Sequence, residues 1–156
     1  MSLTIRDVAW DDPRGEALRV AQRAELTIRY ETPDSEPGPA PTAADITLFL
    51  VAFDGERAIG CGGLRQIDET HGEIKRMFVV PDRRGSGVST AVLHALEDAA
   101  SERGWDRLVL ETGARQPDAI RFYEREGYTL IPNFGHYAHS PISICYERAL
   151  RSNAPE

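Results

Sequence analysis

The residues with the clearest chemical potential form a glycine-rich turn between an apolar segment and an amphipathic one. The turn runs from Arg83 to Ser89 and reads RRGSGVS. Glycines let main-chain N–H groups approach a ligand closely, and the first turn of a helix carries unpaired N–H donors with a partial positive charge. The pattern therefore predicts a phosphate-binding turn. A connection with solvent-facing arginines and no ligand is the alternative.

Two common phosphate motifs do not fit this turn. A G-x-G-x-x-G fingerprint would need a third glycine at Thr90, and a G-x-x-x-x-G-K-[ST] loop would need a lysine after its last glycine. The turn is therefore neither a dinucleotide fingerprint nor a P-loop.

Charged residues also lie just before the turn, in the apolar segment that begins at Glu73. Lys75 is the only lysine in the chain and is followed by Arg76. Alternation along a strand places these two cations on opposite faces, so that one of them faces the substrate side. Such a cation predicts recognition of an acidic group on a small zwitterion, and a weak ion pair with neighbouring carboxylates is the alternative.

Two histidines in the segment Pro132 to Pro141, PNFGHYAHSP, could contact a substrate. His136 and His139 are three residues apart, but no cysteine or third histidine stands at a usual ligand spacing. We therefore expect no metal, and we expect His136 to contact a substrate or to be exposed.

The overall composition limits the partners. The chain has 156 residues, 41% of them hydrophobic, which predicts one domain over residues 1–150 and a short tail at 151–156. Its 18 Lys and Arg residues against 25 Asp and Glu residues give a net charge of -7. A field of that sign disfavours nucleic acid and anionic membranes, so an anion site must be local.

The sequence carries no signal for export or for a disulfide framework. No segment approaches the length of a membrane span, and the first ten residues lack the pattern of a signal peptide. Cys61 and Cys145 are far apart, and we expect both to be buried and reduced. These features predict a cytoplasmic protein.

The hydrophobic pattern alternates between strand and helix periods. The expected strands are Leu3 to Val8, Thr47 to Phe53, Arg57 to Ile67, Ile74 to Val80, Arg107 to Glu111, Tyr128 to Ile131 and Ile142 to Tyr146. The Asp54-Gly55 pair predicts a hairpin between the second and the third of them. This order predicts the α/β class, with a mixed sheet and helices on both faces.

Three helices are expected between these strands. The first opens at Asp12-Pro13, and its core face is predicted to contain Ala17, Leu18, Ala21 and Ile28. The second runs from Val88 to Ala100 and is stopped by Gly104, and the third runs from Pro117 to Gly127. The proline-rich stretch Thr32 to Pro41 is expected to be a loop.

Four local patterns in the chain resemble those of the GNAT N-acetyltransferase superfamily. The acyl-coenzyme A signature [QR]-x-x-G-x-[GA] aligns with Arg84, Gly87 and Ser89, where Ser89 replaces the usual Gly or Ala. The other patterns are GCGGLR, RLVLETG and QPDAIRFYEREGY. The resemblance runs from about Leu48 to the C-terminus and implies a mixed, mostly antiparallel central sheet flanked by helices.

The resemblance implies that acetyl-coenzyme A is the co-substrate. In this family the strand before the turn pairs with pantetheine as if the cofactor were an added strand, and the turn holds the pyrophosphate. The family motif N-x-x-A-x-x-x-Y has Gln116 in place of Asn, with Ala119 and Tyr123 at the other positions. The implied cofactor-binding residues are Met77, Phe78, Val79, Arg84, Gly85, Ser86, Gly87, Val88, Ser89, Thr90 and Gln116.

Attack of an amine on a thioester needs a base for the amine proton, a donor for the developing oxyanion and an acid for the leaving thiolate. The resemblance implies that Tyr123 is the acid and that Glu73 accepts the proton, directly or through water. Glu111 is the next candidate base. The oxyanion donor would be a main-chain N–H near Phe78, if a bulge splays the strand there.

Each of these two catalytic candidates has a structural alternative. Tyr123 could be an aromatic core residue beside Phe122, and Glu73 could be a solvated residue at a strand start. The residues expected to bind the acceptor are Lys75, Arg76, Glu111 and His136.

The resulting hypothesis is an N-acetyltransferase that moves acetyl to a primary amine of a small molecule by direct attack. No nucleophile motif such as G-x-S-x-G argues for a covalent intermediate. Acetylation of a protein amine is a variant of this hypothesis. The alternative is a non-catalytic acyl-coenzyme A binding or sensing module, which the departures at Ser89 and Gln116 suggest. The resemblance also leaves room for a homodimer.

Overall fold

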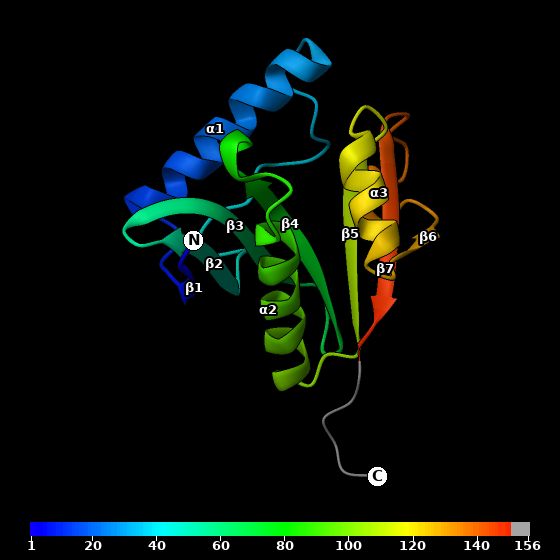
Figure 1. Cartoon of the computed structure of the whole chain (residues 1–156). Helices are drawn as coiled ribbons and strands as arrows, with labels where there is room; N and C mark the ends of the chain where they lie inside the picture. Colours follow the sequence, from blue (N-terminus) through cyan, green and yellow to red (C-terminus); the bar gives the residue numbers. More distant parts are fainter. Residues whose placement is uncertain (151–156) are drawn as a thin grey trace.

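A computed structural model describes residues 1–150, which form one central sheet with helices packed against it (Figure 1). The strands are β1 (Leu3–Asp7), β2 (Leu48–Asp54), β3 (Arg57–Gln66), β4 (His71–Val79), β5 (Arg107–Gly113), β6 (Thr129–Ile131) and β7 (Ser143–Ala149). The helices are α1 (Pro13–Tyr30), α2 (Val88–Glu102) and α3 (Pro117–Arg125), with short 3-10 turns η1 (Pro81–Arg83) and η2 (Gly135–Tyr137). The predicted tail at 151–156 lies outside the described residues.

The sheet is mixed and mostly antiparallel, which confirms the predicted α/β class. Its strand order is β1-β2-β3-β4-β5-β7-β6, and β4 with β5 is the one parallel pair within residues 1–150. The Asp54-Gly55 hairpin forms as predicted, with Gly55 at a φ of 60°. The chain crosses from β4 to β5 through α2, the usual way of joining two parallel strands.

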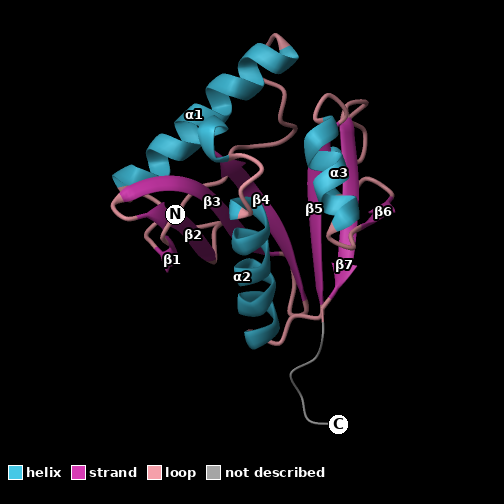
Figure 2. Cartoon of the chain, viewed as in Figure 1, coloured by secondary structure: helices cyan, strands magenta, loops and turns pink. Residues whose placement is uncertain are grey.

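Helices cover both faces of the sheet (Figure 2). Every residue of β2 from Leu48 to Phe53 is buried, because its side chains alternate between two hydrophobic clusters. Leu48, Leu50 and Ala52 belong to the cluster that contains residues of α2 and α3. Phe49, Val51 and Phe53 belong to the second cluster, which also contains Leu18 of α1. The two faces therefore have separate cores.

The face of α1 that packs against the sheet differs from the predicted face. The helix begins as expected, since the Asp12 side chain accepts the Arg14 main-chain N–H at 3.0 Å. Its buried residues are Gly15 and Leu18, whereas Ala17, Ala21 and Ile28 are exposed, so those three predictions are wrong. A Cβ at residue 15 would lie 2.6 Å from the Phe49 ring. The close approach at Gly15 therefore decides which face of α1 meets the sheet.

Strands β4 and β5 separate halfway along their length, as Figure 1 shows. They pair only from His71 with Arg107 to Ile74 with Leu110. Beyond Ile74, a bulge shifts the register between β3 and β4, and Arg76 adopts a φ of 61°. The predicted bulge near Phe78 is present and centres on the residues just before it. The separation leaves one edge of β4 without a neighbouring strand.

Three further features concern the helix ends, the two cysteines and the apolar character of the helices. Gly104 and Gly127, both at positive φ, follow α2 and α3 as predicted. Cys61 and Cys145 are buried free cysteines, and burial raises the pKa of the Cys61 thiol to about 12. Among the described helices, none combines the length and the apolar character that crossing a membrane requires.

Candidate active site

A groove of about 440 Å³ lies between α1 and α3, over the end of β4 and the start of α2. Ten of the predicted cofactor residues line it, namely Met77, Phe78, Val79, Arg84, Gly85, Gly87, Val88, Ser89, Thr90 and Gln116. The eleventh, Ser86, does not line the groove, because its hydroxyl turns back to donate to the Arg83 carbonyl. The structure therefore brings nearly all of this set to one surface.

The first turn of α2 is open to a ligand. No side chain caps this helix, and no acidic residue stands in its first turn. Gly85 and Gly87 have φ values of 79° and 90°, and a Cβ at either position would meet no atom within 4 Å. The backbone conformation requires these glycines, while the space above them is free. Unpaired N–H groups at this point fit the pyrophosphate of coenzyme A.

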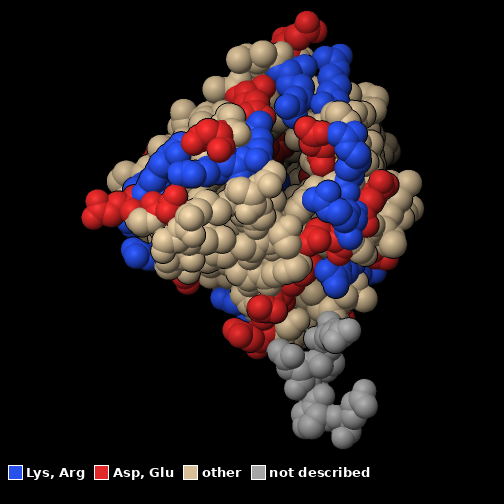
Figure 3. Space-filling view, in the orientation of Figure 1, with Lys and Arg blue, Asp and Glu red and all other residues tan. Residues whose placement is uncertain are grey.

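The charges around the groove also suit an anion. Figure 3 shows basic side chains on both sides of the hollow between α1 and α3. Within its lining the basic residues are Arg29, Arg83, Arg84, Arg121 and Arg125, and the acidic ones are Glu25 and Asp118. The chain as a whole carries a net charge of -7. Basic residues therefore outnumber acidic ones in this lining, although the chain as a whole is acidic.

Side chains of the turn hold the groove together from inside. Arg84 donates to the Val79 carbonyl at 3.0 Å and to Glu25 on α1 at 2.7 Å. Gln22, also on α1, donates to the Met77 carbonyl at 2.9 Å. These contacts fix α1 against the unpaired edge of β4. The Arg84 guanidinium therefore stabilises the conformation of the turn through contacts within the protein.

A second cavity of about 110 Å³ opens where β4 and β5 part. The two spaces meet at six residues that line both, namely Gln22, Leu26, Met77, Gln116, Ala119 and Tyr123. Three carboxylates line the second cavity, those of Glu36, Glu73 and Glu111. The predicted acceptor residues Lys75, Arg76 and Glu111 are brought together here.

Glu73 is a buried residue rather than a solvated one. Its side chain is 1% exposed and accepts from Arg65 at 2.9 and 3.1 Å. The Tyr137 hydroxyl donates to it at 2.8 Å, and Lys75 lies 3.6 Å away. The solvated alternative is therefore wrong, because the pairing of β4 with β5 covers this position. Its contacts with three neighbouring side chains fix this carboxylate in place.

Lys75 and Arg76 lie on the same side of β4, contrary to the prediction that they face opposite ways. Both contact Glu36, Lys75 at 3.4 Å and Arg76 in a close ion pair. The positive φ at Arg76 breaks the alternation of the strand at this point. Burial opposes the ionisation of Glu36, but the charges of Arg76 and Lys75 outweigh it and lower the pKa of Glu36.

Glu111 has a different environment from the other two carboxylates. Ser143 donates to it at 2.6 Å, and within residues 1–150 no basic group lies within ion-pair distance of it. Burial raises the pKa of Glu111, and the negative charge of Glu36 acts in the same direction. The pKa of Glu111 is therefore shifted in the opposite direction from that of Glu36.

Tyr123 is a core residue, as its structural alternative predicts, and its catalytic role stays a prediction. The ring is buried and packs edge-on against Phe122 and Tyr128, with centroids 5.1 and 5.7 Å apart. Its hydroxyl has no hydrogen-bond partner in the described part of the chain, and the residue lines both the groove and the cavity. Burial raises the pKa of Tyr123, so its hydroxyl stays protonated at neutral pH.

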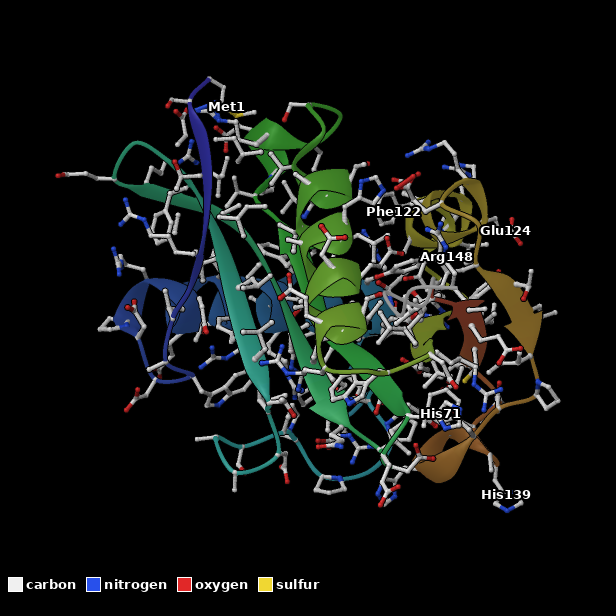
Figure 4. All side chains as sticks on the ribbon, turned by 90° about the horizontal axis from the view of Figure 1, so that it is seen from below. Met1, His71, Phe122, Glu124, His139 and Arg148 are labelled. Atoms are coloured by element: carbon white, nitrogen blue, oxygen red, sulfur yellow. The ribbon has the colours of Figure 1, made fainter. Side chains whose placement is uncertain are left out.

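The predicted residue His136 lies apart from these groups. It packs against Gly38 and lines a separate hollow of about 90 Å³ with Arg65 and Lys75. His139 lies at the periphery of the molecule, as Figure 4 shows. No cluster of three or more His, Cys, Asp or Glu side chains suited to a metal occurs within residues 1–150.

The sequence did not single out Glu36 and Arg65 of the cavity network, and it indicated Tyr137 only as part of the segment Pro132 to Pro141 near the acceptor. Tyr137 accepts a hydrogen bond from Lys75 at 2.8 Å while it donates to Glu73. Burial and the charge of Glu73 raise the pKa of Tyr137. Tyr137 and Glu36 lie on segments without strand or helix periodicity, so only their residue types could have drawn attention to them.

Comparisons with known proteins agree with this geometry. The model of the acetyltransferase (GNAT) family matches residues 5–128. The chain is 37% identical over 103 residues to an IAA acetyltransferase of Azospirillum brasilense, covering 65% of this chain and 67% of the relative. It is 36% identical over 104 residues to the N-acetyltransferase YsnE of Bacillus subtilis, which is uncharacterised, covering 65% and 69%.

Solved structures show the same fold. A Klebsiella pneumoniae protein whose name assigns it to the acyl-CoA N-acyltransferases has a TM-score of 0.80 at 32% identity, over 96% of this chain and 98% of that one. A PaiA N-acetyltransferase of Thermoplasma acidophilum, solved with coenzyme A, has a TM-score of 0.71 at 18% identity, over 96% and 99%. The chain belongs to the acetyltransferase (GNAT) family and is an acetyl-coenzyme A-dependent N-acetyltransferase.

Proposed function

We infer that this enzyme acetylates a primary amine of a small molecule by direct attack on the thioester. The observation that carries this inference is the junction of two unlike spaces at Tyr123. One space is a groove rimmed by arginines that leads to the open first turn of α2. The other is a small cavity lined by carboxylates and suited to an amine. Acetyl-coenzyme A, when bound, supplies a thioester whose acetyl group is transferred.

Glu111 is our candidate for the group that removes the amine proton. The sequence favoured Glu73, but Glu73 is held by Arg65, Tyr137 and Lys75. Glu111 lacks such cationic contacts and has a raised pKa, which improves its ability to accept a proton at neutral pH. In this proposal Glu73 positions Tyr137 and Lys75 without taking part in proton transfer.

Tyr123 is our candidate for the acid. The amine nitrogen forms a bond to the acetyl carbon, the carbon–sulfur bond breaks, and the thiolate takes the Tyr123 hydroxyl proton. Burial raises the pKa of Tyr123 and so keeps the hydroxyl protonated at neutral pH, and within residues 1–150 no protein group accepts a hydrogen bond from it. A main-chain N–H at the bulge after Arg76 is the candidate donor to the carbonyl oxygen.

The size of the cavity favours a small acceptor over a peptide. A volume of about 110 Å³ holds only a small substrate fragment, and the Tyr137 loop closes one side of it. Acetylation of a protein amine would need an open channel for the chain that follows the amine.

The test is a panel of small amines and short peptides, assayed by release of free thiol from acetyl-coenzyme A. We expect turnover with some small amines, and loss of turnover in Glu111→Gln and Tyr123→Phe with coenzyme A affinity retained. Turnover with peptides alone would contradict the small-molecule assignment, and full activity of both variants would contradict the assigned roles.

A further inference from the structure

We propose that Lys75 and Arg76 form an anion subsite for the acceptor, and that Glu36 occupies this subsite until an acidic group of the acceptor displaces it. The proposal deepens the function inferred above and rests on it. It names the substrate class as small primary amines that also carry a carboxylate or a similar anionic group.

Two adjacent side chains of β4 form the subsite. The Lys75 and Arg76 side chains are 11% and 9% exposed, and both reach the carboxylate of Glu36. A regular strand could not bring two adjacent side chains to one anion. Arg76 does so through a φ of 61°, a strained conformation for a residue other than glycine. Backbone strain of this kind concentrates at ligand sites.

Glu36 differs from the other two cavity carboxylates in its position in the chain. Glu73 and Glu111 lie on strands, but Glu36 lies between α1 and β2, where no helix or strand is formed. In Figure 1 this segment crosses from the free end of α1 back to the sheet. A side chain on such a segment can leave without disrupting the sheet hydrogen bonds. Of the three cavity carboxylates, Glu36 is the one that a ligand can replace.

Glu36 balances the charge of Arg76. Lys75 also lies 3.6 Å from Glu73, and Arg23 lies 3.7 Å from Glu36, but within residues 1–150 Arg76 forms an ion pair with Glu36 alone. A buried cation without an anion is costly, so Glu36 can leave Arg76 only when another anion enters. A carboxylate on the acceptor makes that exchange nearly neutral in charge. An amine without an acidic group cannot offer this replacement.

Glu36 and the candidate proton acceptor Glu111 line the same cavity. The charge of Glu36 contributes to the raised pKa of Glu111, so the two groups share one electrostatic environment. Glu36 lines this cavity of about 110 Å³ together with Arg76 and Glu111. An acceptor that places its amine near Glu111 and its acid near Arg76 must take the space of the Glu36 side chain.

The experiment compares acceptors that differ only in the acidic group. A panel of amino acids is assayed together with the corresponding carboxamides, by thiol release, for the wild-type enzyme and for Glu36→Gln. We expect the wild type to prefer the acids. We expect Glu36→Gln to lower KM for the acids by about tenfold. This factor follows if Glu36 leaves the subsite open in only about one wild-type molecule in ten. KM for the carboxamides should change less than about twofold.

Glu31→Gln is the matched control, because Glu31 lies near the start of the same segment, is 84% exposed and, within residues 1–150, forms an ion pair with Arg115 alone, at 3.8 Å. It should leave both classes of acceptor unchanged. An equal rise in KM for acids and carboxamides in Glu36→Gln would show that Glu36 binds the ammonium group and would overturn the proposal. An unchanged KM for the acids would overturn it as well.

A binding measurement separates this proposal from the proposed function. N-acetylglycine and N-acetylglycinamide are titrated calorimetrically into both enzymes in the presence of coenzyme A. Tighter binding of N-acetylglycine to Glu36→Gln, with no change for the amide, supports the subsite even if no amine in the panel is turned over. Equal binding of both ligands to both enzymes contradicts the subsite whether or not turnover is found.

Discussion

Tyr123 lines both the cofactor groove and the acceptor cavity, but different kinds of chemical group form the two spaces. The groove depends on main-chain geometry over one short stretch, from the unpaired edge of β4 to the first turn of α2. The cavity depends on charged side chains from β3, β4, β5 and two loops. Side-chain substitutions should therefore disturb the cavity strongly and the groove weakly, whereas backbone substitutions should do the reverse.

The strongest test of this contrast is Glu111→Gln. Removal of a general base lowers kcat/KM by about 100-fold or more, while the affinity for coenzyme A should stay within about twofold. Glu147→Gln on β7 is the control, since Glu147 lines neither space. A loss of cofactor affinity equal to the loss of turnover would mean that the two sites are not separable.

The same residue predicts the pH dependence. Glu111 accepts a proton only when ionised, and its pKa is raised above its usual value of 4.5 by burial. We therefore expect kcat/KM to rise with pH through that raised pKa, and we expect this acid limb to vanish in Glu111→Gln. An acid limb retained by the variant would assign the titration to another group.

Tyr123→Phe tests the junction between the two spaces. Loss of the acid should lower kcat by about 10- to 100-fold, with little change in the unfolding free energy because the ring stays in the core. Tyr146→Phe is the control, because its hydroxyl contacts Glu124 and lines neither space. Comparable rates in both variants would leave Tyr123 with a packing role alone.

Glu73→Gln tests how far the cavity contributes to stability. The change leaves an amide facing Arg65 and removes the charge that Lys75 and Tyr137 contact. We expect the unfolding free energy to fall by about 1–3 kcal/mol, measured by urea denaturation. Coenzyme A affinity of the folded variant should remain that of the wild type.

Gly87→Ala tests the groove. A Cβ at a φ of 90° strains the backbone and enters the space above the α2 N-terminus, so coenzyme A should bind about tenfold more weakly. Gly104→Ala is a matched control, since its φ is 82°, its surroundings are equally open, and it follows the other end of the same helix. Equal cofactor affinity in the two variants would argue against a pyrophosphate at Gly87.

Ser89→Ala should have the smallest effect. The substitution restores the residue type that the family signature favours and removes a hydroxyl at the start of α2. We expect coenzyme A affinity to change by less than about threefold, within the range of one exposed hydrogen bond.

The contrast also explains what could be predicted from the sequence. The turn from Arg83 to Ser89, the Asp54-Gly55 hairpin and the stops at Gly104 and Gly127 are local signals, and the structure has each of them. The network of Glu36, Arg65 and Tyr137 joins residues 8 to 64 positions away from their partners. No local periodicity could predict such contacts.

Two errors have specific physical causes. The rotation of α1 follows from the close packing of Gly15 on Phe49, a contact that a count of apolar residues does not weigh. The shared side of Lys75 and Arg76 follows from a single left-handed residue in β4. In both cases one local exception overrides a regular pattern.

The central claim is that main-chain amides at the start of α2 hold the pyrophosphate of coenzyme A. The most direct test is calorimetric titration of the wild-type enzyme with coenzyme A and with pantetheine, which lacks the pyrophosphate. We predict a clear heat of association with coenzyme A and binding of pantetheine at least about 100-fold weaker, consistent with the loss of several charge-assisted hydrogen bonds. Equal affinity for the two compounds, or no association with coenzyme A, would contradict the account.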